Sequence, residues 1–307
     1  ISYVFPSRRI AEECASYVAS KSGEAAMVEG AGNGIYAAVI PKSASGLGKA
    51  YWQHSGMVVS SRRARAASDA KAEDIEAGRA AKQALRERIG KLYGGGADNV
   101  WLFPSGMAAI YRAAAVAARH RPSGRRVTVD FPYLDTLKVQ QELVGPTDLV
   151  VPGASQTCDW AACYDDIAGG APVSALLTEV PSNPLLRTAE IPRLGRIARD
   201  SDAVFLIDDT IATPVNVDVT PWADLITVSL TKFFCGEGDV LAGALIVNPA
   251  SPHAADLAEI ADYLHEDLLW GPDAVVVEER SRDFAERVRR INETSERVAA
   301  FFREHPA

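Results

Sequence analysis

The sequence predicts an α/β fold in which helices cover a mostly parallel sheet. Between about residues 100 and 250, short apolar runs that are typical of strands alternate with helical patterns, the order found in parallel sheets. Two of these runs end in polar residues: the run 203–207 leads into Asp208, and the run 225–230 leads into Lys232. Because ligands of such sheets bind beyond the carboxyl ends of the strands, the two residues are candidates for one site.

The chain has 307 residues, more than one hydrophobic core usually needs, so we expect one large domain with an appendage, or two domains. A net charge of −8 argues against nucleic acid as the main partner. The four cysteines form no CxxC pair and the five histidines no pair at helical spacing, so we expect no metal site. These cysteines favour a reducing, cytoplasmic setting, and no apolar run is long enough to cross a membrane.

The N-terminal third is expected to combine helices with a strand. The predicted elements are a helix over residues 8–19, a turn over 30–34, a strand over 35–41, and a long helix over 67–93 that glycines 94–96 end. The stretch 51–63 between them has two interpretations. It is either a solvated loop or an anion clamp based on Arg62 and Arg63, whose guanidinium groups suit phosphate geometry.

A strand over 100–103, a Ser105-Gly106 turn and an alanine-rich helix are predicted next. The first backbone amides of such a helix have no partner within the helix, so they would be free to bind an anion. The alternative is that Ser105 is only a helix cap, because serine is a favoured residue at that position.

The remaining elements alternate between strands and helices. The predicted strands cover residues 126–131, 148–151, 174–179, 203–207, 225–230 and 244–247, and the predicted helices cover 134–144, 160–167, 191–198, 254–264 and 283–303. The last helix places Phe284, Val288 and Ile291 on or near one stripe, so we expect it to have an apolar face.

On the residues alone, Asp208 and Lys232 suggest a site for pyridoxal phosphate. That cofactor needs a lysine for its Schiff base and a carboxylate that keeps a proton on its pyridine nitrogen. Gly236 and Gly238 follow the lysine, and glycines allow the backbone to approach a ligand closely. The alternative is an exposed lysine after an edge strand, because most lysines are exposed.

Motifs in a fixed order then resemble the Cys/Met-metabolism family of pyridoxal-phosphate enzymes, which includes cystathionine γ-synthase, cystathionine lyases and methionine γ-lyase. They are SGMAAI (105–110), PYLDTLK (132–138), EVPSNPLL (179–186), DDT (208–210) and SLTKFFCG (229–236). Further stretches are similar to its fungal-type cystathionine γ-synthase branch: YVFPSRRIAEEC (3–14), YWQHSG (51–56), SSRRA (60–64), VNVDV (215–219) and ERSRDF (279–284). The resemblance covers nearly the whole chain and implies a fold-type I transferase with a mostly parallel seven-stranded sheet.

The resemblance also implies a role for each matching residue. Lys232 is similar to the Schiff-base lysine that moves protons, and Asp208 to the partner of the pyridine nitrogen. Tyr133 is similar to the tyrosine stacked on the cofactor ring, which makes it the second implied catalytic residue, and Asn183 to the asparagine facing the phenolic oxygen. The implied phosphate ligands are Ser105, Gly106, Met107, Ser229 and Thr231, with Arg62 reaching the phosphate of a neighbouring subunit.

Two features depart from the family pattern. Ser60 stands where many members carry a tyrosine, two places before the arginine. The chain also stops at Ala307, about where the family's connecting helix leads into a small C-terminal domain that supplies an arginine for the substrate carboxylate. We therefore expect an interface segment over 1–66, a large cofactor-binding domain over 67–270, and over 271–307 a connecting helix towards a domain missing from this chain.

The reaction implied is γ-replacement on an activated homoserine-type amino acid, with a thiol or another nucleophile added at Cγ. Alternatives are γ- or β-elimination, or a non-catalytic subunit that binds pyridoxal phosphate. The expected partners are an amino-acid substrate, a nucleophile and further copies of the chain in a homodimer or homotetramer, with no nucleic acid and no membrane.

Overall fold

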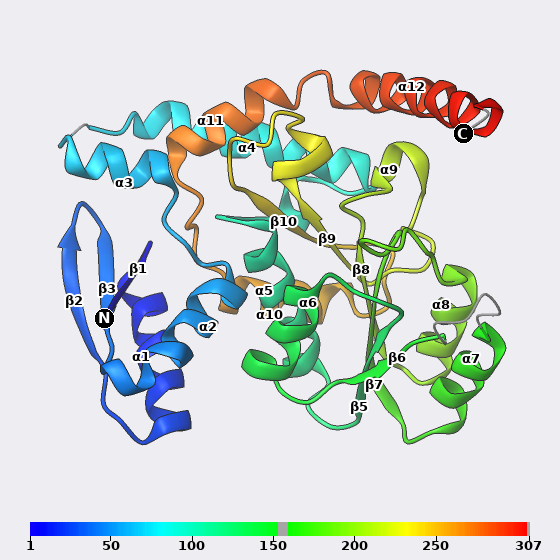
Figure 1. The fold of residues 1–307 in the computed structure, drawn as a ribbon, viewed down its shortest axis with the longest axis horizontal. Helices are drawn as coiled ribbons and strands as arrows, with labels where there is room; N and C mark the ends of the chain where they lie inside the picture. Colours follow the sequence, from blue (N-terminus) through cyan, green and yellow to red (C-terminus); the bar gives the residue numbers. More distant parts are fainter. Residues whose placement is uncertain (71, 153–158, 306–307) are drawn as a thin grey trace.

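The computed structural model describes residues 1–70, 72–152 and 159–305, and its centre is one seven-stranded sheet (Figure 1). The strands lie in the order β4 (Val100–Phe103), β10 (Gly243–Val247), β9 (Leu225–Ser229), β8 (Val204–Asp208), β7 (Val173–Glu179), β5 (Arg125–Val129) and β6 (Asp148–Val150). The last five strands of that order run parallel, whereas β10 is antiparallel to both of its neighbours. The mostly parallel, seven-stranded sheet is therefore confirmed.

Helices cover both faces of this sheet. One face carries α5 (Gly106–His120), α6 (Leu134–Lys138) and α10 (Ala254–Leu264); the opposite face carries α4 (Ile75–Leu92), α7 (Trp160–Gly169), α8 (Ile191–Asp200) and α11 (Gly271–Arg280) (Figure 1). Successive side chains of a strand point to opposite faces. On β8, Leu206 accordingly packs in the same cluster as Ala113 of α5, whereas Ile207 packs with Ile89 of α4. Burial on both sides explains why the strands are continuous apolar runs.

A smaller N-terminal unit lies beside the first of these faces. It comprises β1 (Ser2–Phe5), α1 (Arg8–Ser22), β2 (Met27–Gly32), β3 (Ile35–Val39), η1 (Lys42–Ala44) and α2 (Ser45–Ser55), and its three strands form an antiparallel sheet in the order β1-β3-β2. Apolar side chains of α1 and α5 share one core cluster. The guanidinium of Arg112 on α5 also lies 3.0 Å from the carboxylate of Glu13 on α1, which fixes the unit to the large domain.

The segment before α4 differs from its prediction. Instead of one helix over 67–93, α3 (Ser61–Ser68) and α4 are separated by a break in which Ala70 has a φ of +50°. Asp74 begins α4 because its side chain accepts a hydrogen bond from Ala77 N at 3.0 Å. The stretch 51–63 is not a loop throughout, since it holds the end of α2 and the start of α3. The predicted turn over 30–34 is also partly wrong, because β2 extends to Gly32.

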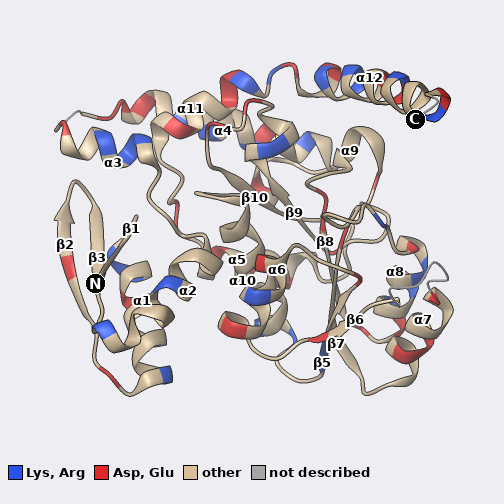
Figure 2. Cartoon of the chain, in the orientation of Figure 1, with Lys and Arg blue, Asp and Glu red and all other residues tan. Residues whose placement is uncertain are grey.

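After α10 the chain forms α11, a helix that was not predicted from the sequence, and then α12 (Phe284–Glu304). Ala274 and Val277 of α11 pack into the same core cluster as α4, so α11 is part of the large fold. Acidic and basic residues are interspersed along α12 (Figure 2). The remaining short elements are η2 (Ala97–Asn99), η3 (Val139–Val144), α9 (Thr213–Asn216) and η4 (Leu230–Phe234), of which η3 and η4 are π-helical. The predicted helix over 134–144 is thus α6 followed by η3.

In the described part of the chain, no helix has the length and apolar character that crossing a membrane requires. The same residues contain no group of three or more histidine, cysteine, aspartate or glutamate side chains that would hold a metal ion. The proposed boundaries at residues 66 and 270 stay predictions.

Candidate active site

A cavity of about 440 Å³ lies at the carboxyl ends of β7, β8 and β9, next to the start of α5. Nine of the ten site residues predicted from the sequence line it; Arg62 does not. The lining residues are Ser105, Gly106, Met107, Ile110, Tyr133, Thr136, Glu179, Pro181, Asn183, Asp208, Thr210, Ile211, Ser229, Thr231, Lys232, Phe233 and Leu241. The cavity therefore stands where open α/β sheets bind their ligands.

Lys232 lies in the π-helical turn η4, which follows β9 directly. Its φ of −87° and ψ of −122° depart from helical values, so the backbone bends at the residue whose side chain lines the cavity. Arg287 of α12 supports this turn, because its Nη2 donates hydrogen bonds to the carbonyl oxygens of Phe233 at 3.2 Å and Phe234 at 2.7 Å. The last helix thus contributes to the position of the lysine.

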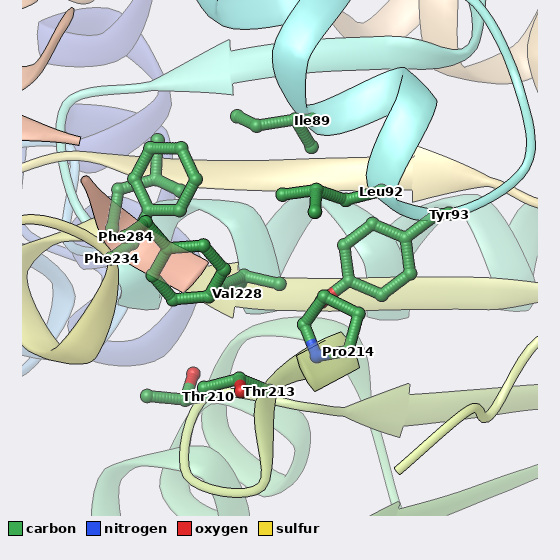
Figure 3. A pocket seen from close by; sticks show the side chains of 10 residues that line it. Ile89, Leu92, Tyr93, Thr210, Thr213, Pro214, Val228, Phe234 and Phe284 are labelled. Atoms are coloured by element: carbon green, nitrogen blue, oxygen red, sulfur yellow. The ribbon is translucent and has the colours of Figure 1, made fainter. Parts of the chain in front are cut away.

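The two neighbouring aspartates at the end of β8, Asp208 and Asp209, have different surroundings. Asp208 lines the cavity, and its Oδ1 accepts a hydrogen bond from Thr210 N at 2.9 Å. Asp209 is fully buried and its Oδ2 accepts a 2.9 Å hydrogen bond from the hydroxyl of Tyr93, the residue that ends α4. Tyr93 and Thr210 line a small apolar cavity between α4 and the loop after β8 (Figure 3). Of the two aspartates, only Asp208 is therefore placed to contact a ligand in the cavity of about 440 Å³.

Glu179 is a buried carboxyl in the same cavity, and it pairs in register with Asp208 across β7 and β8. Burial, followed by the charge of Asp208, raises the pKa of Glu179 to about 8. Burial also raises the pKa of Asp208. A cation bound beside Asp208 would favour its ionised form, so this end of the cavity suits a positively charged group.

Another part of the cavity, lined by the start of α5 and by Ser229 and Thr231, suits an anion, and we call it the anion cradle. Ser105 caps α5 by accepting a hydrogen bond from Ala108 N at 3.1 Å, and its Oγ donates to Gly56 O at 2.7 Å. A side chain at Gly106 would place its Cβ 2.6 Å from Cβ of Ser229, so only glycine permits this contact. The amides at the start of α5 have no partner within the helix and its dipole favours negative charge.

Arg62 lies away from this cavity, on α3. Its guanidinium donates hydrogen bonds to Asp273 Oδ1 and Asp239 Oδ2, each at 3.1 Å. The residue two places earlier, Ser60, caps α3 by accepting from Arg63 N at 3.1 Å. Within one chain, the arginine is therefore paired with carboxylates.

Comparison with known proteins gives two adjoining family matches. Residues 60–307 match the model of the Cys/Met metabolism PLP-dependent enzyme, and residues 2–60 match the N-terminal domain of the fungal trans-sulfuration enzyme. The chain belongs to the Cys/Met-metabolism family of pyridoxal-phosphate-dependent enzymes. The resemblance and the cofactor predicted from the motifs are thereby confirmed.

Two curated relatives show the range of names within this family. The chain is 38% identical over 216 residues to the cystathionine gamma-synthase-like enzyme iboG2 of Amanita muscaria, a match that covers 68% of this chain and 34% of the relative. It is 33% identical over 298 residues to the alanine racemase ungC of Aspergillus violaceofuscus, covering 85% of this chain and 51% of the relative. The chain thus spans about a third to a half of the length of these relatives.

A solved structure supports the fold. The chain has a TM-score of 0.59 and 22% identity to the putative O-acetylhomoserine (thiol)-lyase of Campylobacter jejuni, with 74% of this chain and 61% of that chain covered. That structure contains N′-pyridoxyl-lysine-5′-monophosphate. At this identity the likeness establishes the fold-type I architecture.

The residues of this family member fit pyridoxal 5′-phosphate. The cavity presents a lysine, a buried carboxylate and an anion cradle, which match the aldehyde, the ring nitrogen and the phosphate of the cofactor. The side chain of Tyr133 is 44% exposed, so its ring is available to lie against a planar ligand.

Among the lining residues without a predicted role, Glu179 and Thr210 make hydrogen bonds within the site, and both stand in motifs that carried the resemblance. Glu179 accepts hydrogen bonds from the backbone amides of Tyr133 at 2.8 Å and Asn183 at 3.3 Å. Thr210 donates its amide to Asp208, and its Oγ1 accepts from Ser229 N at 2.8 Å. Both residues tie together segments that are far apart in the sequence, a relation that a linear pattern does not show.

The buried carboxyl of Asp209 predicts a pH dependence of stability. Burial raises its pKa from 3.8 to about 8, so the folded state binds more protons than the unfolded state between these values. Its stabilising contribution is complete below about pH 4 and is lost as the pH rises to about 8, at a cost on the order of a few kcal/mol. An Asp209→Asn variant should lose less stability over this interval than the wild type.

Denaturant unfolding from pH 5 to pH 8.5 measures this difference. Glu259→Gln, which removes an exposed carboxylate on α10, is the matched control and should follow the wild-type slope. Equal slopes for Asp209→Asn and the wild type would contradict the prediction.

Proposed function

We propose that this chain carries the cofactor site of an enzyme that replaces the γ-substituent of an activated homoserine-type amino acid, with a thiol as the nucleophile. The proposal is supported above all by the convergence of Lys232, Asp208 and the anion cradle on one cavity. The match to the fungal trans-sulfuration N-terminal domain and the likeness to iboG2 favour γ-replacement within the family.

Pyridoxal phosphate, when bound, supplies an electron sink for negative charge at Cα of an amino acid. We assign to Lys232 Nζ the removal of the Cα proton and its later return, and to Asp208 the retention of the proton on the ring nitrogen. Ser105, Ser229 and the start of α5 would hold the phosphate, and Tyr133 would lie against the ring. In the overall exchange the bond from Cγ to the leaving group breaks, a bond from Cγ to sulfur forms, and the thiol proton leaves with the departing group.

Product analysis tests this function. The protein with its cofactor is supplied with an O-acylated homoserine and cysteine, and the expected product is the thioether in which sulfur is joined to Cγ. A 2-oxo acid and ammonia as the main products would instead establish the lyase alternative. Conversion of L-alanine to its D-enantiomer would support racemisation. If the protein binds the cofactor but turns over no substrate, the result would favour the alternative of a non-catalytic subunit.

We propose further that the site is shared between subunits. Arg62 is only half-buried and lies outside the cavity of its own chain, so an arginine that serves the phosphate would reach the cavity of a neighbouring copy. Closed two-fold assemblies place the same surface of each copy against the other, so both sites would be completed at once. The dimeric or tetrameric state and the cytoplasmic location stay predictions.

Complementation between two inactive variants tests the shared site. Arg62→Ala and Lys232→Ala proteins are mixed in equal amounts under conditions that exchange subunits. Each mixed dimer then contains one site with both residues intact, so about a quarter of the wild-type activity should return, because half of the dimers are mixed. If each chain completes its own site, no activity returns. A monomer by light scattering would also contradict the proposal.

A further inference from the structure

The carboxyl group of Glu179, the last residue of β7, joins two walls of the cavity. Its Oε1 accepts a hydrogen bond from Tyr133 N at 2.8 Å, and its Oε2 accepts one from Asn183 N at 3.3 Å. Tyr133 lies directly before α6, whereas Asn183 lies in the turn after β7, so the two amides come from separate segments. Both residues line the cavity with exposed side chains. One buried side chain therefore holds the backbone of both residues.

Each of the two segments also has backbone hydrogen bonds of its own. The carbonyl oxygen of Tyr133 accepts a bond from Thr136 N at 2.9 Å, in the first turn of α6. In the turn after β7, Ser182 O accepts a bond from Leu186 N at 2.8 Å. Such local bonds determine the shape of each segment, but they do not determine the distance from one segment to the other.

A second link between the same two segments lies outside the lining of the cavity. Arg187, which follows the turn after β7, forms an ion pair with Asp130, the residue directly after β5. Asp130 is buried and has a φ of +70°, a conformation that asparagine adopts as readily as aspartate does. This ion pair therefore provides a comparison for Glu179, because it joins the same segments without facing a ligand in the cavity.

The surroundings of Glu179 determine which form of its carboxyl group makes these contacts. Its side chain is 6% exposed, and the other titratable residues that line the cavity are Asp208, Tyr133 and Lys232. An ionised carboxylate offers two acceptor oxygens and no donor, so the ionised form fits the two backbone amides. Burial, followed by the charge of Asp208, opposes this form and raises the pKa of Glu179 to about 8, whereas the two amides lower it.

We propose that Glu179 is a positioning residue that fixes the ring of Tyr133 relative to the side chain of Asn183, so that one face and one edge of a planar cofactor are recognised together. The proposal rests on the function proposed above, from which the roles of Tyr133 and Asn183 come. The competing explanation is that Glu179, like the ion pair outside the cavity, only joins two segments and contributes stability.

Amide resonances test the contacts in the protein freed of cofactor. The protein is labelled with ¹⁵N in its tyrosines and asparagines, and the two resonances are identified by their loss in Tyr133→Phe and Asn183→Asp. Both amides should titrate with one common midpoint near pH 8, because they bond to one carboxyl group. Glu179→Gln should abolish this common titration. Asp209→Asn, which removes another buried carboxyl whose pKa is raised to about 8, is the control and should retain it.

The wild type alone already puts the proposal at risk in this experiment. Two different midpoints for Tyr133 and Asn183 would overturn it, because the amides would then respond to different groups. A common titration that persists in Glu179→Gln would overturn it as well.

Cofactor binding separates positioning from a purely stabilising role. The Kd of pyridoxal 5′-phosphate and the denaturant midpoint of the cofactor-free protein are measured for two variants. Glutamine offers one acceptor oxygen to the two amides, so Glu179→Gln should raise Kd roughly tenfold. Asp130→Asn breaks the link outside the cavity, so it should lower the denaturant midpoint and leave Kd close to the wild-type value. A Glu179→Gln protein that binds as tightly as the wild type, or an equal loss of affinity in both variants, would overturn the proposal.

A double-mutant cycle connects the effect to the tyrosine ring. Tyr133→Ala removes the ring but keeps the amide, so Glu179→Gln should cost less affinity in this background than in the wild type. Equal costs in the two backgrounds would refute positioning of the ring. If Tyr133→Ala itself binds as the wild type does, the proposed role of Tyr133 fails and the proposal fails with it. If Tyr133→Ala weakens binding but Glu179→Gln does not, only the positioning proposal fails.

Discussion

In a Lys232→Ala variant, turnover is expected to fall by a factor of about 10³ or more, because a positioned acid–base group alone contributes roughly 10² to 10⁴ in rate. The same change removes the amine that would hold the cofactor covalently. The π-helical turn η4 presents this side chain to the cavity, and the packing around it, including the support of Arg287, does not depend on the lysine amine. The variant should therefore fold normally.

Borohydride reduction checks the assignment independently of the reaction. Reduced wild-type protein should carry the cofactor on the peptide that contains Lys232, and reduced Lys232→Ala should carry none. Lys138→Ala on α6 and Lys91→Ala at the end of α4 are the controls, and both should retain the adduct. An adduct on Lys138 or Lys91 in the wild type would refute the role of Lys232.

The strands of the sheet could be predicted because they are buried on both faces and therefore appear as apolar runs. Asp208 at the end of β8 and Lys232 after β9 could be predicted as a pair for a related reason: parallel strands bring their carboxyl ends to the same edge. The roles of the individual site residues came from the resemblance to the family motifs, because the spacing of residues in the sequence does not indicate them. Nine of the ten predicted site residues line one cavity. The variants proposed here test whether each assigned role is correct.

Other features depend on contacts between distant segments. Glu179 could be interpreted as the polar end of a strand, and its two amide partners come from loops after β5 and β7. The pair of His54 and Asp135 joins residues that are 81 positions apart. The break between α3 and α4 has no proline or glycine to indicate it; its sequence signal was the capping residue Asp74. The local sequence patterns around these residues do not indicate which distant residues they contact.

Replacing Asp208 by asparagine is the second change with a large expected effect, a loss of turnover of roughly a hundredfold or more. Asparagine has nearly the shape of aspartate, so the hydrogen bond from Thr210 N to the side-chain oxygen can persist. A neutral amide does not stabilise a proton on the ring nitrogen, so the electron sink weakens and removal of the Cα proton slows. We assign binding of the cofactor phosphate to other residues, so the variant should still take up cofactor.

The neighbouring aspartate provides a matched control for this prediction. Asp209→Asn makes the same chemical change one residue later, but on the side chain that bonds to Tyr93 beneath α4 (Figure 3). Steady-state turnover and cofactor content are measured for both variants. Asp208→Asn should contain cofactor and turn over slowly, whereas Asp209→Asn should keep most of its turnover and differ in the pH dependence of its stability. The opposite pattern would assign the role of ring-nitrogen partner to Asp209. Near-normal turnover in both variants would show that neither aspartate has this role.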